Sequence, residues 1–265
     1  MKISELFNVS GKVAVVTGGS RGIGEMISSG FLANGVKVYI TARKEGPLVE
    51  KAEELAKKYD GVCIPIVCDL SSAVGIDYFL KKIREKEDAI DFLINNAGAA
   101  WGQPFDEFSE AGWDKVMDLN VKSLFFLTQK LTEMLKVRAS SNNPSRVINI
   151  GSIDGLNVPA FETYSYSTSK AAVHHLTRVM AAKLVKENIL VNAIAPGPYP
   201  SQMLGSAVEH DYSETARKNP RNRVGLPEDI AGLAIFLCSQ AGSYIVGETI
   251  ASDGGIVKTA GHNLG

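Results

Sequence analysis

A tyrosine and a lysine stand four positions apart in the stretch YSYSTSK, residues 164–170, where a long apolar helical segment begins. On a helix, the side chains of Tyr166 and Lys170 lie on the same face, about one turn apart. A lysine ammonium beside a phenol favours the phenolate and is expected to lower the pKa of Tyr166 toward neutral pH. Tyr164 has Thr168 at the same offset and lacks this partner. Tyr166 is therefore the candidate proton donor, although this pair also occurs on ordinary helix surfaces.

Two further polar residues accompany the pair. Ser152 follows the apolar run RVINI, 146–150, and a hydroxyl at the carboxyl end of a parallel strand points into the crevice where such folds bind ligands. Asn120 lies among apolar neighbours in a long helical segment, where it either serves a site or is a satisfied interior amide. Together with Tyr166, these groups predict proton transfer to or from a substrate oxygen.

A glycine-rich turn, TGGSRGIG at 17–24, follows the first apolar run and opens the first helical segment. Gly18, Gly22 and Gly24 have no β-carbon, so the turn can be tight and a pyrophosphate can approach the backbone amides at the positive end of the helix. A glycine motif alone is weak evidence, because any tight turn uses glycine. Its position between a first strand and a first helix favours dinucleotide binding.

The end of the second apolar run indicates which dinucleotide is bound. VKVYIT, 36–41, leads into Ala42, Arg43 and Lys44, with no carboxylate to hold the adenosine ribose hydroxyls. Arg43, helped by Arg21, could instead pair with a 2′-phosphate. The sequence therefore predicts NADP rather than NAD, the alternative being that Arg43 and Lys44 are solvated loop charges.

The elements that must position these residues follow from hydrophobic patterning. Short, nearly continuous apolar runs predict strands buried on both faces, and helical patterns separate them, which is typical of βαβ units and a parallel sheet. The predicted strands are 12–17, 36–41, 62–67, 91–94, 146–150 and 189–194, and the main helical segments are 24–34, 47–59, 73–86, 110–136 and the segment that begins with YSYSTSK.

Pro65 refines this prediction. It lies inside the third run and cannot donate a ladder hydrogen bond, so this strand should be a sheet edge, as the third strand is in the dinucleotide-binding order 3-2-1-4-5-6. We expect an α/β fold, with a doubly wound, Rossmann-type parallel sheet of about seven strands and helices on both faces. No repeat, low-complexity tract or linker divides the chain, so residues 1–265 are expected to form one domain.

Composition excludes several classes of function. The chain has 28 basic and 29 acidic residues, which argues against a nucleic-acid partner. It has neither an apolar run long enough for a membrane span nor a signal peptide, so a cytoplasmic location is expected. The 3 cysteines and 4 histidines form no metal-ligand pattern, and no metal is predicted. Cys63 and Cys68 lie five apart on a strand, so their thiols should face opposite sides of the sheet.

Taken together, TGGSRGIG, NNAG at 95–98, Asn120, Ser152 and YSTSK resemble, in order and spacing, the classical short-chain dehydrogenase/reductase family over essentially the whole chain. The resemblance implies that Tyr166 is the general acid and that Lys170 lowers its pKa and holds the nicotinamide ribose. It also implies that Ser152 binds the substrate oxygen and that Asn120 holds a water connected to Lys170. The cofactor residues that it implies are Gly18, Ser20, Arg21, Gly22, Ile23, Gly24, Arg43, Asp69, Leu70, Asn96, Ala97, Gly98, Tyr166, Lys170, Pro196, Gly197 and Ser201.

Within this family, the chain is most similar to 3-oxoacyl thioester reductases, in particular 3-oxoacyl-[acyl-carrier-protein] reductase of the rhamnolipid-synthesis branch. That similarity implies a role in fatty acid metabolism, a substrate lid around 199–226 with an apolar pocket and a basic rim, and a homotetramer. Asn143 and Glu187 stand where carrier-protein reductases present arginines to the acyl carrier protein, so CoA is an alternative carrier. Sugar, polyol or small-ketone dehydrogenases share every motif, and a non-enzymatic cofactor sensor is a further, weaker alternative because such proteins typically lack the tyrosine or the lysine.

Overall fold

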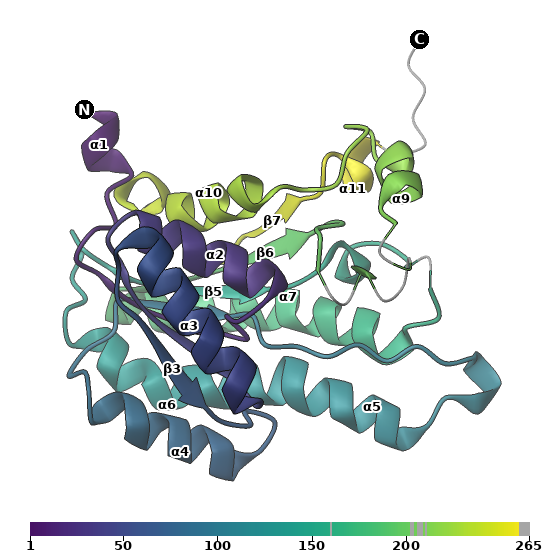
Figure 1. Ribbon diagram of the computed structural model, residues 1–265, viewed down its shortest axis with the longest axis horizontal. Helices are drawn as coiled ribbons and strands as arrows, with labels where there is room; N and C mark the ends of the chain where they lie inside the picture. Colours follow the sequence, from purple (N-terminus) through teal and green to yellow (C-terminus); the bar gives the residue numbers. More distant parts are fainter. Residues whose placement is uncertain (160, 202–203, 206–208, 210, 260–265) are drawn as a thin grey trace.

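The computed structural model describes residues 1–159, 161–201, 204–205, 209 and 211–259. At its centre is a seven-stranded sheet in the order β3-β2-β1-β4-β5-β6-β7, in which every neighbouring pair is parallel (Figure 1). The strands are β1 (Val13–Thr17), β2 (Lys37–Ala42), β3 (Cys63–Val67), β4 (Phe92–Asn95), β5 (Ser145–Ile150), β6 (Ile189–Pro196) and β7 (Thr249–Ser252).

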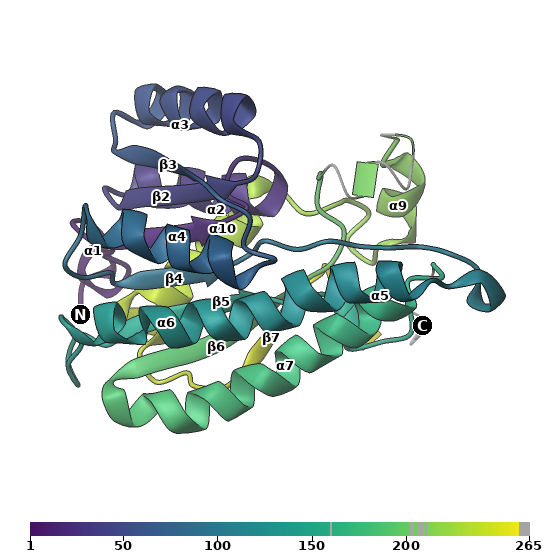
Figure 2. The same ribbon diagram turned by 90° about the horizontal axis from the view of Figure 1, so that it is seen from below.

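Helices cover both faces of this sheet, because successive strand side chains point to opposite sides. Val13 and Val15 join the hydrophobic cluster under one helical layer, whereas Ala14 and Val16 join the cluster under the other. The first layer, seen in Figure 2, comprises α4 (Ala73–Arg84), α5 (Glu110–Met117), α6 (Leu124–Lys136) and α7 (Tyr164–Leu184). The second comprises α2 (Gly22–Ala33), α3 (Glu45–Tyr59) and α10 (Pro227–Cys238). Short elements are α1 (Ile3–Leu6), α9 (Ser213–Lys218), α11 (Ile256–Thr259) and the turns η1 (Phe105–Glu107), η2 (Asp118–Ser123), η3 (Ile153–Gly155), η4 (Val185–Glu187) and η5 (Gln240–Gly242).

The predicted fold class is confirmed, and so is each predicted strand. Pro65 lies in β3, which pairs only with β2 and is an edge of the sheet. Cys63 and Cys68 belong to opposite hydrophobic clusters, and the three cysteines are free thiols. The sequence did not reveal β7, because TIAS is short and half-buried and has no apolar run.

The helical segment 110–136 differs from its prediction. It is interrupted by η2, a π-helical turn over Asp118–Ser123, so that α5 and α6 are separate α-helices. Asn120 lies in this turn, and π-turns inside helices are frequent at functional sites.

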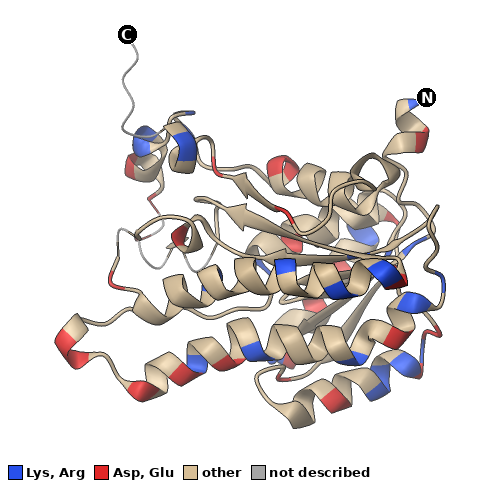
Figure 3. Cartoon of the chain, turned by 180° about the vertical axis from the view of Figure 1, so that it is seen from behind, with Lys and Arg blue, Asp and Glu red and all other residues tan. Residues whose placement is uncertain are grey.

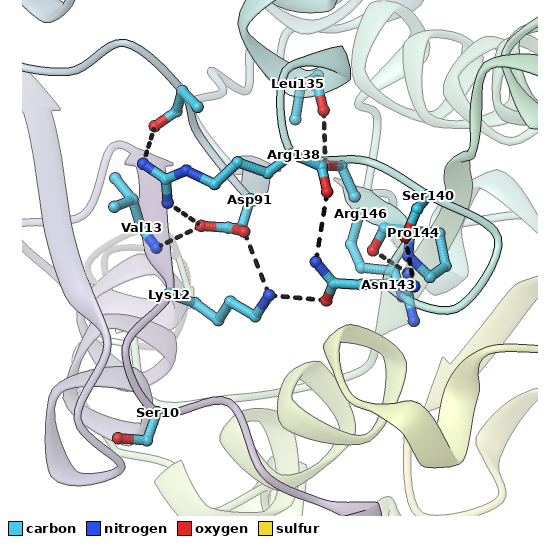
Figure 4. Close-up of polar contacts among 12 residues, drawn as sticks. Ser10, Lys12, Val13, Asp91, Leu135, Arg138, Ser140, Asn143, Pro144 and Arg146 are labelled. Carbon is cyan, nitrogen blue, oxygen red and sulfur yellow. Dashed lines mark hydrogen bonds and ion pairs between the residues drawn. The ribbon is translucent and has the colours of Figure 1, made fainter.

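The amino-terminal edge of the sheet is held by one buried carboxylate, Asp91, immediately before β4 (Figure 4). Asp91 accepts hydrogen bonds from the Val13 amide and the Arg138 guanidinium, each at 3.0 Å, and from Lys12 Nζ at 3.3 Å. Lys12 also donates to Asn143 Oδ1 at 2.7 Å. This network ties β1 and β4 to the segment that leads into β5, so it fixes the alignment of strands whose opposite ends carry the candidate site.

Surface charge agrees with the composition. Basic and acidic residues are interspersed along the helices seen in Figure 3. Within the described part of the chain, no helix is long and apolar enough to cross a membrane, and no cluster of His, Cys, Asp or Glu could hold a metal ion.

Candidate active site

The glycine turn between β1 and α2 requires glycine for two different reasons. Gly18 and Gly22 have φ angles of +63° and +55°, in the left-handed region that residues with a β-carbon rarely adopt. A β-carbon on Gly24 would lie 2.3 Å from the Gly18 carbonyl oxygen, so the helix packs directly on the turn. The first amides of α2 are thereby left facing the carboxyl edge of the sheet, where an anion can be bound.

Thr17 and Asn96 lock this turn to the neighbouring strand. The Asn96 amide donates to the carbonyl oxygens of Thr17 and Gly18 at 2.8 and 3.1 Å. Thr17 is 2% exposed, and its hydroxyl accepts from the backbone amides of Asn96 and Ala97 at 2.9 and 2.8 Å. Asn96 was predicted to line the cofactor, and its side chain holds the turn. Thr17 was not singled out, although a threonine at the last position of a buried strand could have suggested this role.

The other residues predicted to contact the cofactor gather at the same edge. A β-carbon on Gly22 would lie 3.2 Å from Ser201 Cβ, so the glycine turn faces the segment after β6. Arg43 directly follows β2 and is exposed, with no acidic residue beside it in the sequence. Asp69 follows β3 and holds Ser71, accepting from its amide at 3.0 Å and from its hydroxyl at 2.8 Å. The remaining members of the set are Ser20, Arg21 and Ile23 in the turn, Leu70 after β3, Ala97 and Gly98 after β4, and Pro196 and Gly197 at the end of β6.

Ser152, Tyr166 and Lys170 are brought together where β5 ends and α7 begins. Lys170 Nζ lies 5.5 Å from the centre of the Tyr166 ring and donates to the Ile150 carbonyl at 2.8 Å. Ser152 is buried, its hydroxyl accepts from the Asp154 amide at 3.1 Å, and its polar interaction with Tyr166 acts to lower the pKa of that phenol. The choice of Tyr166 over Tyr164 fits this geometry. Tyr164 donates to Glu162 at 2.8 Å and packs edge-on against two phenylalanine rings.

The expected lowering of the Tyr166 pKa is wrong for the protein as it is folded. Burial raises the pKa of Tyr166 to about 12. The interaction with Ser152 acts to lower this pKa, and the charge of Asp154 acts to raise it further. Burial also lowers the pKa of Lys170 to about 8. The physical reason is that low-polarity surroundings disfavour both charged forms, and the ammonium is directed toward the Ile150 carbonyl rather than toward the phenol oxygen.

Asn120 is a satisfied amide in the π-turn. Its side-chain oxygen accepts from the Ala99 amide at 2.8 Å, and its nitrogen donates to the Ala99 carbonyl at 3.0 Å and to the Ser169 hydroxyl at 2.9 Å. A β-carbon on Gly98 would lie 3.2 Å from Asn120 Oδ1 and 3.7 Å from Lys170 Nζ, so the three residues adjoin. Asn120 therefore joins the NNAG loop to α7 beside Lys170.

A chain of buried side chains fixes α6 and α7 on the sheet beneath these groups. Asn95 Nδ2 donates to Thr128 at 3.0 Å and to Asn149 at 2.9 Å, and Asn149 donates to Thr177 at 2.9 Å. Thr128 and Thr177 lie on α6 and α7, respectively. This chain sets the positions of both helices relative to the ends of β4 and β5.

From the sequence alone, His174, one turn beyond Lys170, is expected only to pack or to contact another subunit, whereas the structure places it beside the site. It is 4% exposed, and its Nε2 accepts from the Ser152 amide at 3.4 Å. Burial lowers the pKa of His174 to about 4, with the charge of Lys170 acting in the same direction and the Gly155 backbone opposing it. The adjacency of two histidines in the sequence, His174 and His175, gave no signal of this contact.

The segment expected to form a lid carries less free positive charge than its sequence indicates. Lys218 pairs with Glu214 at 2.7 Å, and Arg223 pairs with Asp229 through both nitrogens at 2.6 and 3.1 Å. Two apolar residues of this segment, Met203 and Val208, lie outside the described residues, so the apolar pocket expected there is untested at these positions. Arg221, by contrast, is exposed and lines a cavity of about 340 Å³ beside Tyr199 and Ser252.

The chain matches known proteins over nearly its whole length. The family model described as enoyl-(acyl carrier protein) reductase matches residues 18–257. The chain is 43% identical to the rhamnolipids biosynthesis 3-oxoacyl-[acyl-carrier-protein] reductase of Pseudomonas aeruginosa, over 94% of this chain and 97% of that protein. It is 36% identical to the 2-dehydro-3-deoxy-D-gluconate 5-dehydrogenase of Dickeya dadantii, over 96% and 98% of the two chains.

A solved structure agrees with these relatives. The Pseudomonas aeruginosa RhlG/NADP active-site complex superimposes with a TM-score of 0.91 at 42% identity, covering 95% of this chain and 98% of that one. The family model, the curated relatives and the solved structure all match this chain over nearly its whole length. The chain belongs to the short-chain dehydrogenase/reductase family of oxidoreductases.

Proposed function

We propose that this protein is an NADPH-dependent carbonyl reductase that reduces a 3-oxoacyl thioester, with Tyr166 as the general acid. The observation that carries the proposal is the convergence of Ser152, Tyr166 and Lys170 beside a glycine turn open to an anion. The relative from Pseudomonas aeruginosa, named as a 3-oxoacyl-[acyl-carrier-protein] reductase, supports this substrate class.

The residues at the carboxyl edge of the sheet fit a dinucleotide phosphate. Gly18, Gly22 and Gly24 leave the backbone amides at the start of α2 accessible to a pyrophosphate. Arg43 would pair with the 2′-phosphate, and Arg21 lies in the same turn. When bound, the cofactor supplies the hydride. The related solved structure from Pseudomonas aeruginosa is a complex with NADP, which supports NADP as the cofactor here.

The protein's own task is to orient the carbonyl and deliver a proton. Tyr166 stays protonated at neutral pH because burial raises its pKa to about 12, which suits a general acid in the reductive direction. The hydroxyls of Ser152 and Tyr166 would both donate to the carbonyl oxygen as negative charge develops there. Lys170, close to the ring, would stabilise the phenolate that forms when the proton is lost.

Exposed apolar side chains in the chain segment between Ser152 and Tyr166 support an acyl substrate. Leu156, Val158 and Phe161 are exposed on the segment that joins η3 to α7, with exposed fractions of 41%, 94% and 56%. An aliphatic chain attached to the reacting carbonyl would bury this apolar surface, whereas a sugar acid would leave it in water.

Both acyl carrier protein and CoA are included in the proposal as carriers of the thioester. Glu187 pairs with Lys136 at 3.5 Å, and Asn143 is held by Lys12 in the network of Figure 4. Neither position offers the cation through which acyl carrier protein is expected to bind, so acyl-CoA is included as a substrate.

The second candidate function is oxidoreduction of a sugar acid, which the dehydrogenase from Dickeya dadantii supports. A cofactor sensor without activity is disfavoured because Tyr166 and Lys170 are both present.

We also propose that the protein assembles into a homotetramer in the cytoplasm. Phe125 and Phe126 on α6 and Val179 on α7 expose 36%, 40% and 53% of their surface, and a second copy would cover them. The three cysteines are free thiols, which fits a reducing compartment.

The test is NADPH oxidation with acetoacetyl-CoA, a longer 3-oxoacyl-CoA, a 3-oxoacyl carrier-protein thioester, a keto-sugar acid and a simple diketone, repeated with NADH. Thioester turnover with a preference for NADPH is the expected result. Turnover of the keto-sugar acid alone would retain the mechanism and replace the substrate. NADPH binding without turnover of any substrate would favour the sensor.

A further inference from the structure

Two consecutive turns of α7 hold the end of β5 from the same side. Lys170 donates to the carbonyl of Ile150, and His174, one turn later, accepts from the amide of Ser152. Between these contacts, the Gly151 amide continues the sheet by donating to the Ile194 carbonyl at 2.7 Å. The backbone that presents the Ser152 hydroxyl is therefore clamped by the helix whose first turn presents Tyr166.

The clamp depends on glycine at two positions of the segment that His174 contacts. A β-carbon on Gly151 would lie 2.1 Å from Nε2 of His174, and one on Gly155 would lie 2.9 Å from Cε1. Real side chains do not tolerate such distances, so the imidazole occupies space that only glycine leaves free. The side chain at position 174 therefore packs where the facing residues, Gly151 and Gly155, have no side chains.

The histidine does not have the hydrogen bonds that a purely structural imidazole would need. Because Nε2 accepts from the Ser152 amide, the neutral ring carries its proton on Nδ1. Nδ1 is buried, and among the described residues no atom meets it with hydrogen-bond geometry; the nearby Gly155 backbone affects the pKa of the ring without making such a bond. A buried unpaired donor costs stability, and an apolar side chain of similar size would avoid that cost. The one contact that an apolar residue could not supply is the acceptor for Ser152.

From this geometry we infer that His174 is a positioning residue for the reaction: its Nε2 fixes the backbone of Ser152, and thereby the serine hydroxyl that orients the substrate carbonyl. The inference rests on the role proposed for Ser152. His174 itself touches neither substrate nor cofactor in this scheme. Because the Ser152 hydroxyl also accepts from the Asp154 amide, both its backbone and its side chain are held by the protein before substrate arrives.

The test compares substitutions at His174 that keep or remove the acceptor. His174→Leu fills the space without an acceptor, whereas the side-chain oxygen of His174→Gln can take the place of Nε2. We expect the leucine variant to lose about 10- to 100-fold in kcat, with the dissociation constant for NADPH unchanged, because a misplaced reacting group costs rate rather than cofactor binding. The glutamine variant should recover most of that loss. His175→Leu is the matched control, since His175 is exposed and contacts Arg178.

A second pair of variants tests the close packing of Gly151 against His174. This test does not require the leucine variant to fold. Gly151→Ala should displace the imidazole and lower kcat, and adding His174→Ala should cost less than the product of the two single effects, because the same contact is already lost. Wild-type kcat in His174→Leu, equal losses in the leucine and glutamine variants, or fully additive effects of Gly151→Ala and His174→Ala would each overturn the inference. Tyr166→Phe, assayed in parallel, separates this outcome from failure of the proposed function: if that variant stays active, the proton-donor role itself is wrong.

Discussion

Lys170 lies against the ring of Tyr166, with its ammonium 5.5 Å from the ring centre, yet it hydrogen-bonds to a backbone carbonyl and not to the phenol oxygen. In the folded protein the lysine thus holds the end of β5 and at the same time places a positive charge near the tyrosine. Its substitution should therefore affect both the architecture of the site and the chemistry of the proton transfer.

Replacing Tyr166 with phenylalanine should abolish most of the reductase activity. The ring and its packing remain, but the proposed proton donor is lost, and general acid catalysis contributes about 10²- to 10⁴-fold. NADPH titration by fluorescence should show that the cofactor still binds. Tyr164→Phe, two residues away, serves as the control and should retain activity because Tyr164 is engaged with Glu162.

The rate of reduction should fall as the pH rises through about 8. Burial lowers the pKa of Lys170 to about 8, so the ammonium that is proposed to stabilise the developing phenolate is lost above that pH. Below it, the rate should be nearly constant, since burial raises the pKa of Tyr166 to about 12 and the phenol stays protonated. The measurement is kcat/KM against pH for wild type and for Lys170→Met, whose profile should be low and flat. A wild-type rate that falls only above pH 10, or that increases with pH, would contradict the assignment.

Arg43→Ser should weaken NADPH and leave NADH nearly unaffected. A hydrogen bond to a charged group is worth roughly 1.5–3 kcal/mol, which corresponds to an increase of about 10- to 100-fold in the KM for NADPH. Arg84→Ser is a matched control, because Arg84 is exposed at the end of α4. Equal losses with both cofactors would show that Arg43 does not read the 2′-phosphate.

Thr17→Val should destabilise the fold and loosen the glycine turn. Valine has nearly the same shape but leaves the backbone amides of Asn96 and Ala97 without their acceptor. A loss of about 2 kcal/mol would lower Tm by about 4–8 °C, and the affinity for NADPH should fall with it. Thr132→Val removes a hydroxyl that only donates back to the Thr128 carbonyl within α6, and it should change Tm much less. Similar Tm values for the two variants would argue against the role of Thr17.

Phe126→Glu should reduce the size of the assembly. A charge on the exposed apolar surface of α6 cannot be buried against a second copy without a large desolvation penalty. Sedimentation velocity should then show a smaller species than wild type at the same protein concentration. Val74→Glu, at an 80% exposed position on α4, should leave the distribution unchanged. If both variants sediment as wild type, α6 is not part of the interface.

The sequence by itself determined the strands β1 to β6 and their alternation with helices, the edge position of β3 and the family. Continuous apolar runs mark strands buried on both faces, and a proline cannot donate within a ladder, so these features are local. The turn at Gly18, Gly22 and Gly24 and the pair Tyr166 and Lys170 are local as well, since a strand–turn–helix and one helical turn bring their members together.

Tertiary structure decided what depends on contacts between distant segments. The direction of the Tyr166 pKa shift is set by burial, and burial is not encoded in the spacing of Tyr166 and Lys170. Asn120 in the π-turn hydrogen-bonds to Ala99 and Ser169, which are 21 and 49 positions away in the chain. The contact between His174 and the Ser152 amide spans 22 positions of the chain. Packing of α7 on the end of β5 creates that contact, and periodicity along one segment gives no sign of it.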